Sequence, residues 1–285
     1  FVLGYKNGYD LYTPRPMVAP AQDPGNLLPP DLEGSEQRDL GKNGTYLVFR
    51  QLAQDVPGFW RTLDKLAAEA GSVIRSTVQL ASKMVGRWPS GTSLVQSPGH
   101  DDPDVAFKDD FLYQDSDSDG QKCPLGAHVR RTHPRDSLPP EPGSQKSLDF
   151  SNRHRLLRRG RVWGKAFDPS MNPEVFLEKL RARDVTDDEP RGLHFICLNA
   201  NIGRQFEFVQ HTWSNNPGFN SLRHEPDPIS GSRNAFGRTQ DQFTVQKEPF
   251  RHRLGSLPAF VHTLGGGYFF LPGRSALRYL FRQAG

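Results

Sequence analysis

The feature that most constrains the fold of this chain is the order of its strand-like and helix-like segments. Four segments have the length and the β-branched or aromatic content of strands: 45–50, 155–163, 192–198 and 267–271. After the first strand, Asp55 is a suitable helix N-cap, and an apolar stripe at helical spacing runs from there to Gly71. A weaker helical pattern covers 76–85, and an amphipathic one runs from Phe206 to Trp213 after the third strand. The order strand, helix, strand, strand, helix, strand predicts a ferredoxin-like α+β sandwich of antiparallel sheet and helices.

Composition predicts long connections around this core. The chain has 285 residues, of which 27 are Gly and 24 are Pro, so much of it is expected to be loop. We expect residues 1–43 to form an extended N-terminal arm and residues 44–285 to form the ferredoxin-like domain, with a long loop insertion at 86–150. The first residues, 1–5, resemble neither a signal peptide nor the start of a protein, and they read like the middle of a longer chain.

Charge and motif content argue against several classes of function. The chain has 36 Lys and Arg against 32 Asp and Glu, a net charge of +4 that does not by itself indicate nucleic-acid binding. Cys123 and Cys197 cannot form a disulfide framework; a single bridge between them is one alternative, and free thiols are the expectation. No apolar run approaches the roughly 18 residues of a membrane span. The segment 115–120 opens like an EF-hand calcium loop, but Gly126 stands where that loop needs a bidentate Glu.

The segment 123–136 carries two histidines, of which His128 comes directly before a cluster of arginines and His133 within that cluster has no comparable context. We expect a tight turn and then a short extended run that presents the imidazole. A neutral imidazole is a good fifth ligand for haem iron, and its second ring nitrogen then donates to a carboxylate, which makes the ligand more electron-rich. A lone histidine is more often a satisfied structural residue, so the residues by themselves leave both interpretations open.

The sequence also resembles the dye-decolourising haem peroxidases in segments that follow one another in the family's order. These segments are 44–50, 54–60, 86–88, 123–136, 158–164, 191–195, 205–207 and 265–272. The resemblance implies a peroxidase with haem b, iron protoporphyrin IX, in which His128 is the proximal iron ligand. It also implies that hydrogen peroxide is the oxidant and that dyes, phenols or similar organic compounds are the reducing substrates.

Further site residues follow from the same resemblance. Arg158 matches the family's distal arginine, which would stabilise the negative charge that develops as peroxide is cleaved. Leu193 and Phe195 share one face of their strand and match the apolar wall of the distal pocket, although core packing explains them equally well. As the carboxylate partner of His128 we expect Glu207, on the helix after that strand. Trp88, Trp163 and Tyr268 would be either core residues or carriers of electrons from bulky dyes at the surface to the haem.

One part of the family pattern is missing. The motif Gly-x-x-Asp-Gly, which supplies a distal aspartate, does not occur, and 116–120 begins with serine and lies too late in the chain to replace it. We therefore expect this aspartate on an N-terminal half that is absent, cleaved or carried by a separate polypeptide. Two alternatives stay open, a haem-binding module without efficient turnover and an arginine-rich nucleic-acid-binding domain of ferredoxin-like fold.

Overall fold

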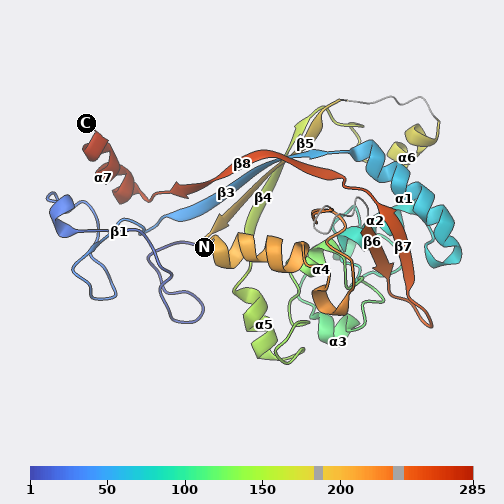
Figure 1. Cartoon of the computed structure of the whole chain (residues 1–285), viewed down its shortest axis with the longest axis horizontal. Helices are drawn as coiled ribbons and strands as arrows, with labels where there is room; N and C mark the ends of the chain where they lie inside the picture. Colours follow the sequence, from blue (N-terminus) through green and yellow to red (C-terminus); the bar gives the residue numbers. More distant parts are fainter. Residues whose placement is uncertain (183–188, 234–240, 285) are drawn as a thin grey trace.

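Four antiparallel strands form the central sheet of the computed structural model, which describes residues 1–182, 189–233 and 241–284 (Figure 1). The strands are β3 (Thr45–Gln54), β4 (Leu157–Gly164), β5 (Arg191–Asn199) and β8 (Val261–Leu271). Their order across the sheet is β4-β5-β3-β8, and each neighbouring pair is antiparallel. This connectivity confirms the ferredoxin-like α+β class predicted from the order of the segments.

The two predicted helices after β3 are confirmed, with their capping residues. Asp55 caps α1 (Val56–Ala70), because its side chain accepts a hydrogen bond of 2.8 Å from the Gly58 amide. Ser76 caps α2 (Thr77–Val85) in the same way. That helix ends at Gly86, whose φ of 97° is a left-handed conformation that favours glycine. The local sequence signals therefore fix both helices at both ends.

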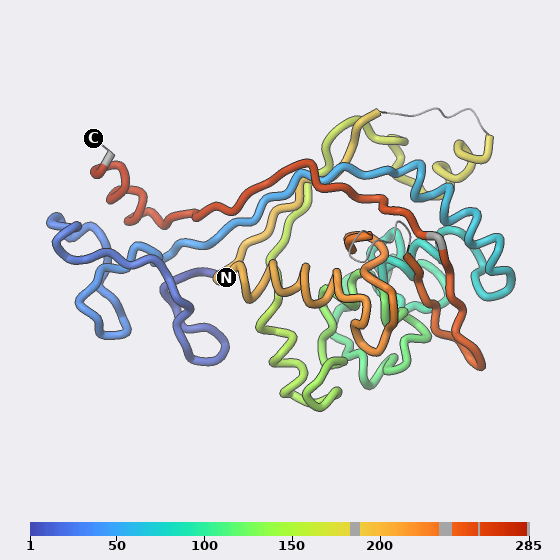
Figure 2. Tube along the Cα trace, viewed as in Figure 1, coloured from blue at the N-terminus to red at the C-terminus, as the bar shows by residue number. Residues whose placement is uncertain are grey.

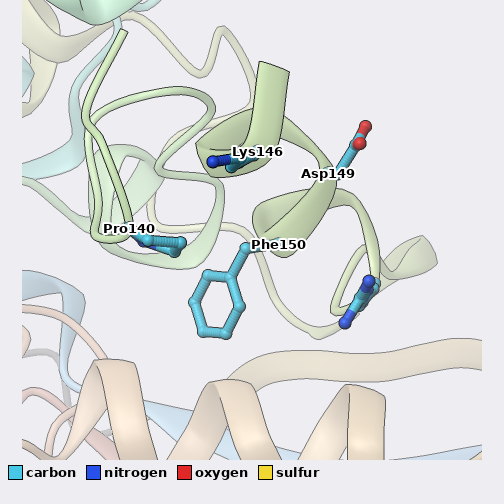
Figure 3. Close-up of a pocket in the computed structure, with 5 residues that line it drawn as sticks. Pro140, Lys146, Asp149 and Phe150 are labelled. Carbon is cyan, nitrogen blue, oxygen red and sulfur yellow. The ribbon is translucent and has the colours of Figure 1, made fainter. Parts of the chain in front are cut away.

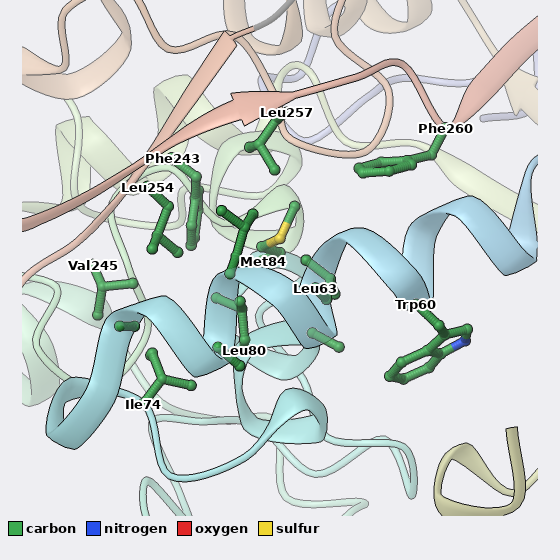
Figure 4. Close-up of a cluster of buried hydrophobic side chains, with 14 of the residues drawn as sticks. Trp60, Leu63, Ile74, Leu80, Met84, Phe243, Val245, Leu254, Leu257 and Phe260 are labelled. Atoms are coloured by element: carbon green, nitrogen blue, oxygen red, sulfur yellow. The ribbon is translucent and has the colours of Figure 1, made fainter. Parts of the chain in front are cut away.

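The main hydrophobic core lies away from the sheet, among helices and a hairpin (Figure 4). Helix α1 leaves the end of β3 and packs on α2, on α6 (Pro173–Arg181) and on β7 (His252–Leu257), which pairs with β6 (Asp241–Val245). Leu63, Leu80 and Met84 are completely buried there, and Leu257 reaches them from the hairpin. Because burying one such side chain contributes about 1.5–3 kcal/mol, this core is a large part of the stability of the fold.

One face of the sheet is covered by a segment of wide helical turns, η4 (Gly203–Glu207) and η5 (Val209–Ser214). Its hydrogen bonds include i to i−5 pairs, such as the one from the Glu207 amide to the Ile202 carbonyl at 3.0 Å. Phe206 packs on Phe195 of β5, with ring centroids 5.9 Å apart, over the fully buried Val48 and Cys197. The predicted amphipathic helix is thus confirmed, with π-helical turns, which are rare and often found at functional sites.

Residues 86–150 contain several short helices between loops. They are η3 (Pro103–Val105), α3 (Tyr113–Asp117), α4 (His128–Thr132) and α5 (Gln145–Asn152). The short extended run expected at His128 is therefore wrong, since this residue begins α4. The segment that resembles the start of a calcium loop lies partly in α3, where Asp117 is buried against Arg130. That carboxylate is consequently occupied by a cation of the protein itself.

Part of the N-terminal arm and the C-terminal helix lie together at one end of the molecule, as Figure 2 shows in blue and red. Strand β1 (Met17–Val18) is followed by η1 (Pro20–Gln22) and pairs with β2 (Arg38–Asp39). Val18 and Leu28 pack against Ala276 and Tyr279 of α7 (Arg274–Ala284). Smaller 3₁₀ turns are η2 (Gly71–Val73) and η6 (Phe219–Ser221). Within the described ranges, no helix has both the length and the apolar character needed to cross a bilayer.

Candidate functional site

Helix α4 is held in place by two buried arginines that follow His128. Arg131 donates to the Trp213 carbonyl at 2.8 Å, the Asn216 carbonyl at 3.1 Å and the Glu225 carbonyl. Burial lowers the pKa of Arg131 to about 10, so the guanidinium stays charged at neutral pH. Because these carbonyls belong to η5 and to the chain that follows it, Arg131 fastens α4 to the segment that also covers the sheet.

The second arginine fixes the other side of the helix. Arg130 is completely buried, donates to Asp117 Oδ2 at 3.0 Å and to the Cys123 carbonyl at 2.8 Å, and lies 4.2 Å above the Tyr113 ring. A buried guanidinium needs such hydrogen-bond and charge partners, because burying it unpaired would strongly destabilise the fold. A helix of only five residues thereby gains the rigidity that its own hydrogen bonds would not provide.

The imidazole of His128 is oriented by a buried carboxylate. Its Nδ1 lies 2.9 Å from Oδ2 of Asp227, whose side chain is fully buried while that of His128 is 29% exposed. The other carboxylate oxygen accepts from the amides of Ile229 at 2.9 Å and Ser230 at 2.8 Å. Asp227 thus accepts the hydrogen bond from His128 Nδ1 and fixes the histidine tautomer that has its proton on that nitrogen. The lone pair of Nε2 is left available to a ligand.

The surroundings keep this carboxylate ionised. Burial alone would raise the pKa of Asp227, but the charge of His128, the hydrogen bonds from His128 and Ser230, and the Arg131 guanidinium lower it to about 2. Asp227 is therefore negative throughout the neutral range. His128 and Asp227 together therefore match a metal-binding histidine whose second ring nitrogen donates to a charged carboxylate.

The sequence led us to expect Glu207 as the carboxylate partner of His128, but the structure places Asp227 there instead. Glu207 is exposed on η4, next to Tyr268 of β8, where it contributes after burial to a raised pKa of the Tyr268 hydroxyl. Asp227 holds the position at His128 instead, from a loop 99 residues further along the chain. The one sequence signal for it is its place between Pro226 and Pro228, which restricts the local backbone.

The other predicted residues lie together on one face of the sheet. In the pairing of β4 with β5, Arg158 is opposite Cys197, Gly160 is opposite Phe195, and Val162 is opposite Leu193. These alternate positions point to the same side, which is the side that Phe206 covers in part. Arg158 is exposed there, and Leu193 and Phe195 are half-buried.

Gly160 makes room for the side chain of Leu193 on this face. A Cβ atom at this position would lie 2.9 Å from Leu193 Cδ1, nearer than side chains normally approach. The face therefore presents apolar side chains and two guanidinium groups, those of Arg158 and of Arg50, which pairs with Phe195 and lies 5.4 Å from the centre of the Phe206 ring.

The segment η4–η5 connects this face to His128. Its first half carries Phe206, which packs on the sheet, and its second half carries Trp213, whose carbonyl binds Arg131 of α4. In the described part of the chain, no hydrogen bond or ion pair joins His128 directly to Arg158, Leu193 or Phe195. The histidine and the sheet face are thus parts of one packed unit that share a helical support.

The donor set suits an iron that already has other ligands. No group of three or more His, Cys, Asp or Glu residues that could hold a metal ion occurs in the described ranges. One imidazole with a charged acceptor is a poor site for a bare ion, but it is the usual axial ligand for an iron held by the four nitrogens of a porphyrin. The half-buried Leu193 and Phe195 and the exposed Arg158 of the sheet face also fit a flat, apolar group that carries carboxylates.

The aromatic residues considered as electron carriers are in different surroundings. Trp88 is buried in a separate cluster and donates to the Ser97 carbonyl at 2.7 Å, and Trp163 donates to the Leu52 carbonyl at 3.1 Å. Tyr268 is the most exposed of the three, at 44%. Their hydrogen bonds explain why the two tryptophans lie where they do, and an electron-transfer role stays a prediction.

Comparisons with known proteins give consistent matches. The multifunctional dye peroxidase DyP2 of Amycolatopsis sp. is 34% identical over 250 residues, which are 83% of this chain and 49% of that protein. The dye-decolorizing peroxidase AauDyP1 of Auricularia auricula-judae is 34% identical over 248 residues, 82% of this chain and 46% of that protein. The crystal structure of a DyP-type peroxidase of Anabaena sp. aligns with a TM-score of 0.67 at 28% identity, over 82% of this chain and 46% of that one.

These matches cover most of the chain but only part of its relatives. No family model matches the sequence. The chain spans about half the length of the curated relatives that it matches.

Proposed function

This chain belongs to the dye-decolourising peroxidase family, and we propose that it binds haem b through His128 Nε2 in a protein that uses hydrogen peroxide to oxidise dyes or phenols. The observation that carries the proposal is the hydrogen bond between His128 Nδ1 and the buried Asp227. It supplies what a peroxidase needs on the proximal side, a histidine with a fixed tautomer and a charged acceptor.

The substrate class is supported by the relatives. A dye-decolorizing peroxidase solved as a complex with 2,6-dimethoxyphenol aligns with 89% of this chain at a TM-score of 0.64. We propose a phenol or a dye as the electron donor of the present protein as well. Each peroxide molecule takes two electrons and two protons to give two waters, so two donor molecules would each lose one electron. Bound haem supplies the redox chemistry that links these two half-reactions.

The residues of this chain would act on both sides of the cofactor. Asp227 holds the proton on His128 Nδ1 and increases the basicity of Nε2. On the other side, the guanidinium of Arg158 would stabilise negative charge on the departing oxygen, and Leu193 and Phe195 would exclude water from it. The proton that peroxide must move needs an acid, and we propose that this distal acid comes from residues outside the present sequence.

The visible absorption spectrum of the protein as isolated tests the proposal. We expect a Soret band in the wild type, and we expect His128→Ala to lose it or to shift it to the spectrum of another axial ligand. The matched control is His252→Ala, because this half-buried histidine begins β7, far along the chain from α4. Full peroxidase activity in His128→Ala would contradict the proposal. A normal Soret band without peroxide turnover would favour a haem-binding module.

A further inference from the structure

An open pocket of about 230 Å³ lies beside α5, apart from the residues of the proposed haem site. It is lined by Pro140, Lys146, Asp149, Phe150 and Arg153. Figure 3 shows the Phe150 ring below Lys146 and beside Pro140, with the Asp149 carboxylate on the other side of the helix. Pockets for drug-sized ligands measure about 300–1,000 Å³, so this one suits a ligand of one or two rings.

The pocket has a cation without a matching carboxylate. The Arg153 guanidinium lies 4.5 Å from the centre of the Tyr9 ring, which holds it by a cation–π contact. Tyr9 is fixed in turn, because its hydroxyl donates to the Asp149 backbone carbonyl at 2.6 Å. Among the described residues, no carboxylate forms an ion pair with Arg153. Arg153 is therefore positioned by an aromatic ring and keeps its hydrogen-bond donors for another anion.

The remaining charges of the pocket favour an anion too. Lys146 pairs with Glu141 at 2.8 Å, but both side chains are more than half exposed, so the pair contributes little and is easily exchanged. The Asp149 carboxylate is engaged with Gln145, which donates to it at 2.7 Å. Lys146 and Arg153 thus remain as cations at the pocket, and the Asp149 carboxylate points away from the Phe150 ring.

The floor of the pocket is aromatic and rigid. The Phe150 ring packs edge-on against His154, Phe208 and Trp213, with centroid distances of 5.1, 6.2 and 6.4 Å. His154 in turn stacks on Phe208 at 3.6 Å. A ring fixed in this way offers a flat surface to an aromatic ligand at little entropic cost. The cluster also reaches the proposed haem site, because the Trp213 carbonyl binds Arg131 of α4.

We propose that this pocket binds an aromatic acid, a compound of one or two rings with a carboxylate or sulfonate group. Its ring would lie against Phe150 and Pro140, and its anionic group would take hydrogen bonds from Arg153, with Lys146 nearby. That such an acid is a reducing substrate rests on the peroxidase function proposed above. The binding itself does not depend on that function.

Isothermal titration calorimetry of the isolated protein with naphthalenesulfonate tests the site, with naphthalenemethanol as the neutral probe of similar shape. We expect the sulfonate to bind at least several times more tightly than the alcohol, and Arg153→Gln to weaken it about threefold to fivefold, as for an exposed ion pair. Adding Lys146→Gln should increase the loss to about tenfold. Arg251→Gln, which removes an exposed arginine between β6 and β7, is the matched control and should leave binding unchanged.

The ring contact is tested by Phe150→Leu, which keeps an apolar side chain and should weaken both probes. Its unfolding midpoint is measured alongside, and Phe150→Tyr, which keeps the ring, should restore binding. Equal affinity for the sulfonate and the alcohol, or equal affinities of the Arg153 and Arg251 variants, would overturn the proposal. If the protein shows a Soret band but does not bind the sulfonate, only the proposed aromatic-acid site is refuted. If it binds the sulfonate but shows no Soret band, only the proposed peroxidase function is refuted.

Discussion

The substitution Asp227→Asn separates the charge of the proximal acceptor from its shape. The wild-type carboxylate accepts from three donors, which are His128 Nδ1 and the amides of Ile229 and Ser230. An asparagine has one acceptor oxygen and a donor amide group, so at least one of these N–H groups would face another N–H. The variant therefore loses the negative charge and leaves a buried donor unsatisfied.

The magnitude follows from the pKa. The fall of the pKa of Asp227 from its ordinary 3.8 to about 2 corresponds to about 2 kcal/mol of stability, at 1.36 kcal/mol per pKa unit. A buried donor without a partner costs about 1–3 kcal/mol. We expect Asp227→Asn to lower the free energy of unfolding at pH 7 by about 2–4 kcal/mol, measured by urea unfolding with tryptophan fluorescence.

The same pKa gives the sign of the pH dependence. A carboxyl group whose pKa is lower in the folded state stabilises the fold above its unfolded pKa, and it loses this contribution as the pH falls through the folded value. The stability difference between wild type and Asp227→Asn should therefore shrink as the pH is lowered from about 4 toward 2. A difference that stays constant over this window would show that the charge of Asp227 is not the cause.

A second readout concerns the haem iron. A weaker acceptor makes His128 a poorer electron donor, so the reduction potential of the iron should rise in Asp227→Asn. Asp168→Asn is the matched control, because hydrogen bonds from Lys179 and Ser170 also lower the pKa of Asp168 to about 2. This control should leave the potential unchanged. An unchanged potential and an unchanged unfolding midpoint in Asp227→Asn would refute the assigned role.

Further predictions concern the sheet face and the support of α4. Arg158→Leu should keep the Soret band but slow the reaction with peroxide by about 100-fold, measured by stopped-flow absorbance. Gly160→Val should lower the free energy of unfolding by about 1–3 kcal/mol in urea titrations, because its Cβ would lie 2.9 Å from Leu193 Cδ1. Arg131→Met should lower it by about 3 kcal/mol or more, measured in the same way, because buried carbonyls lose their donor.

The parts of the fold that were predicted from the sequence depend on local signals. The start of α1 is set by a capping side chain, and its end by Gly71, so a short window of sequence contains the information. The ferredoxin-like class followed from the order of such elements along the chain. Helix α4 could not be found in this way, because five residues carry no periodicity and the helix depends on the distant partners of Arg130 and Arg131.

The site was predictable only in part, for a related reason. His128 was singled out by the resemblance of its segment to the peroxidase family, and the same resemblance, together with their shared face of a strand, indicated Leu193 and Phe195. The contact between His128 and Asp227 joins residues 99 positions apart in loops and a short helix, where no spacing rule applies. Glu207 was expected instead because it lies on a regular element, but its direction depends on π-helical turns that the sequence did not reveal.

The charge of Asp227 must persist in the state in which His128 binds iron, and this gives Arg131 a second role. Part of the lowered pKa of Asp227 comes from a positive charge on His128, yet a histidine whose Nε2 binds a metal cannot carry the second ring proton. The donors that remain are His128 Nδ1, Ile229 and Ser230, and the cations that interact with the carboxylate are Arg131, three residues further along α4, and Arg233. Arg131 therefore supplies, together with Arg233, the positive charge that keeps the carboxylate ionised when the imidazole is neutral. In Arg131→Met loaded with haem, the reduction potential should shift upward, in the same direction as in Asp227→Asn, whereas a purely structural role would change the unfolding midpoint and leave the potential in place.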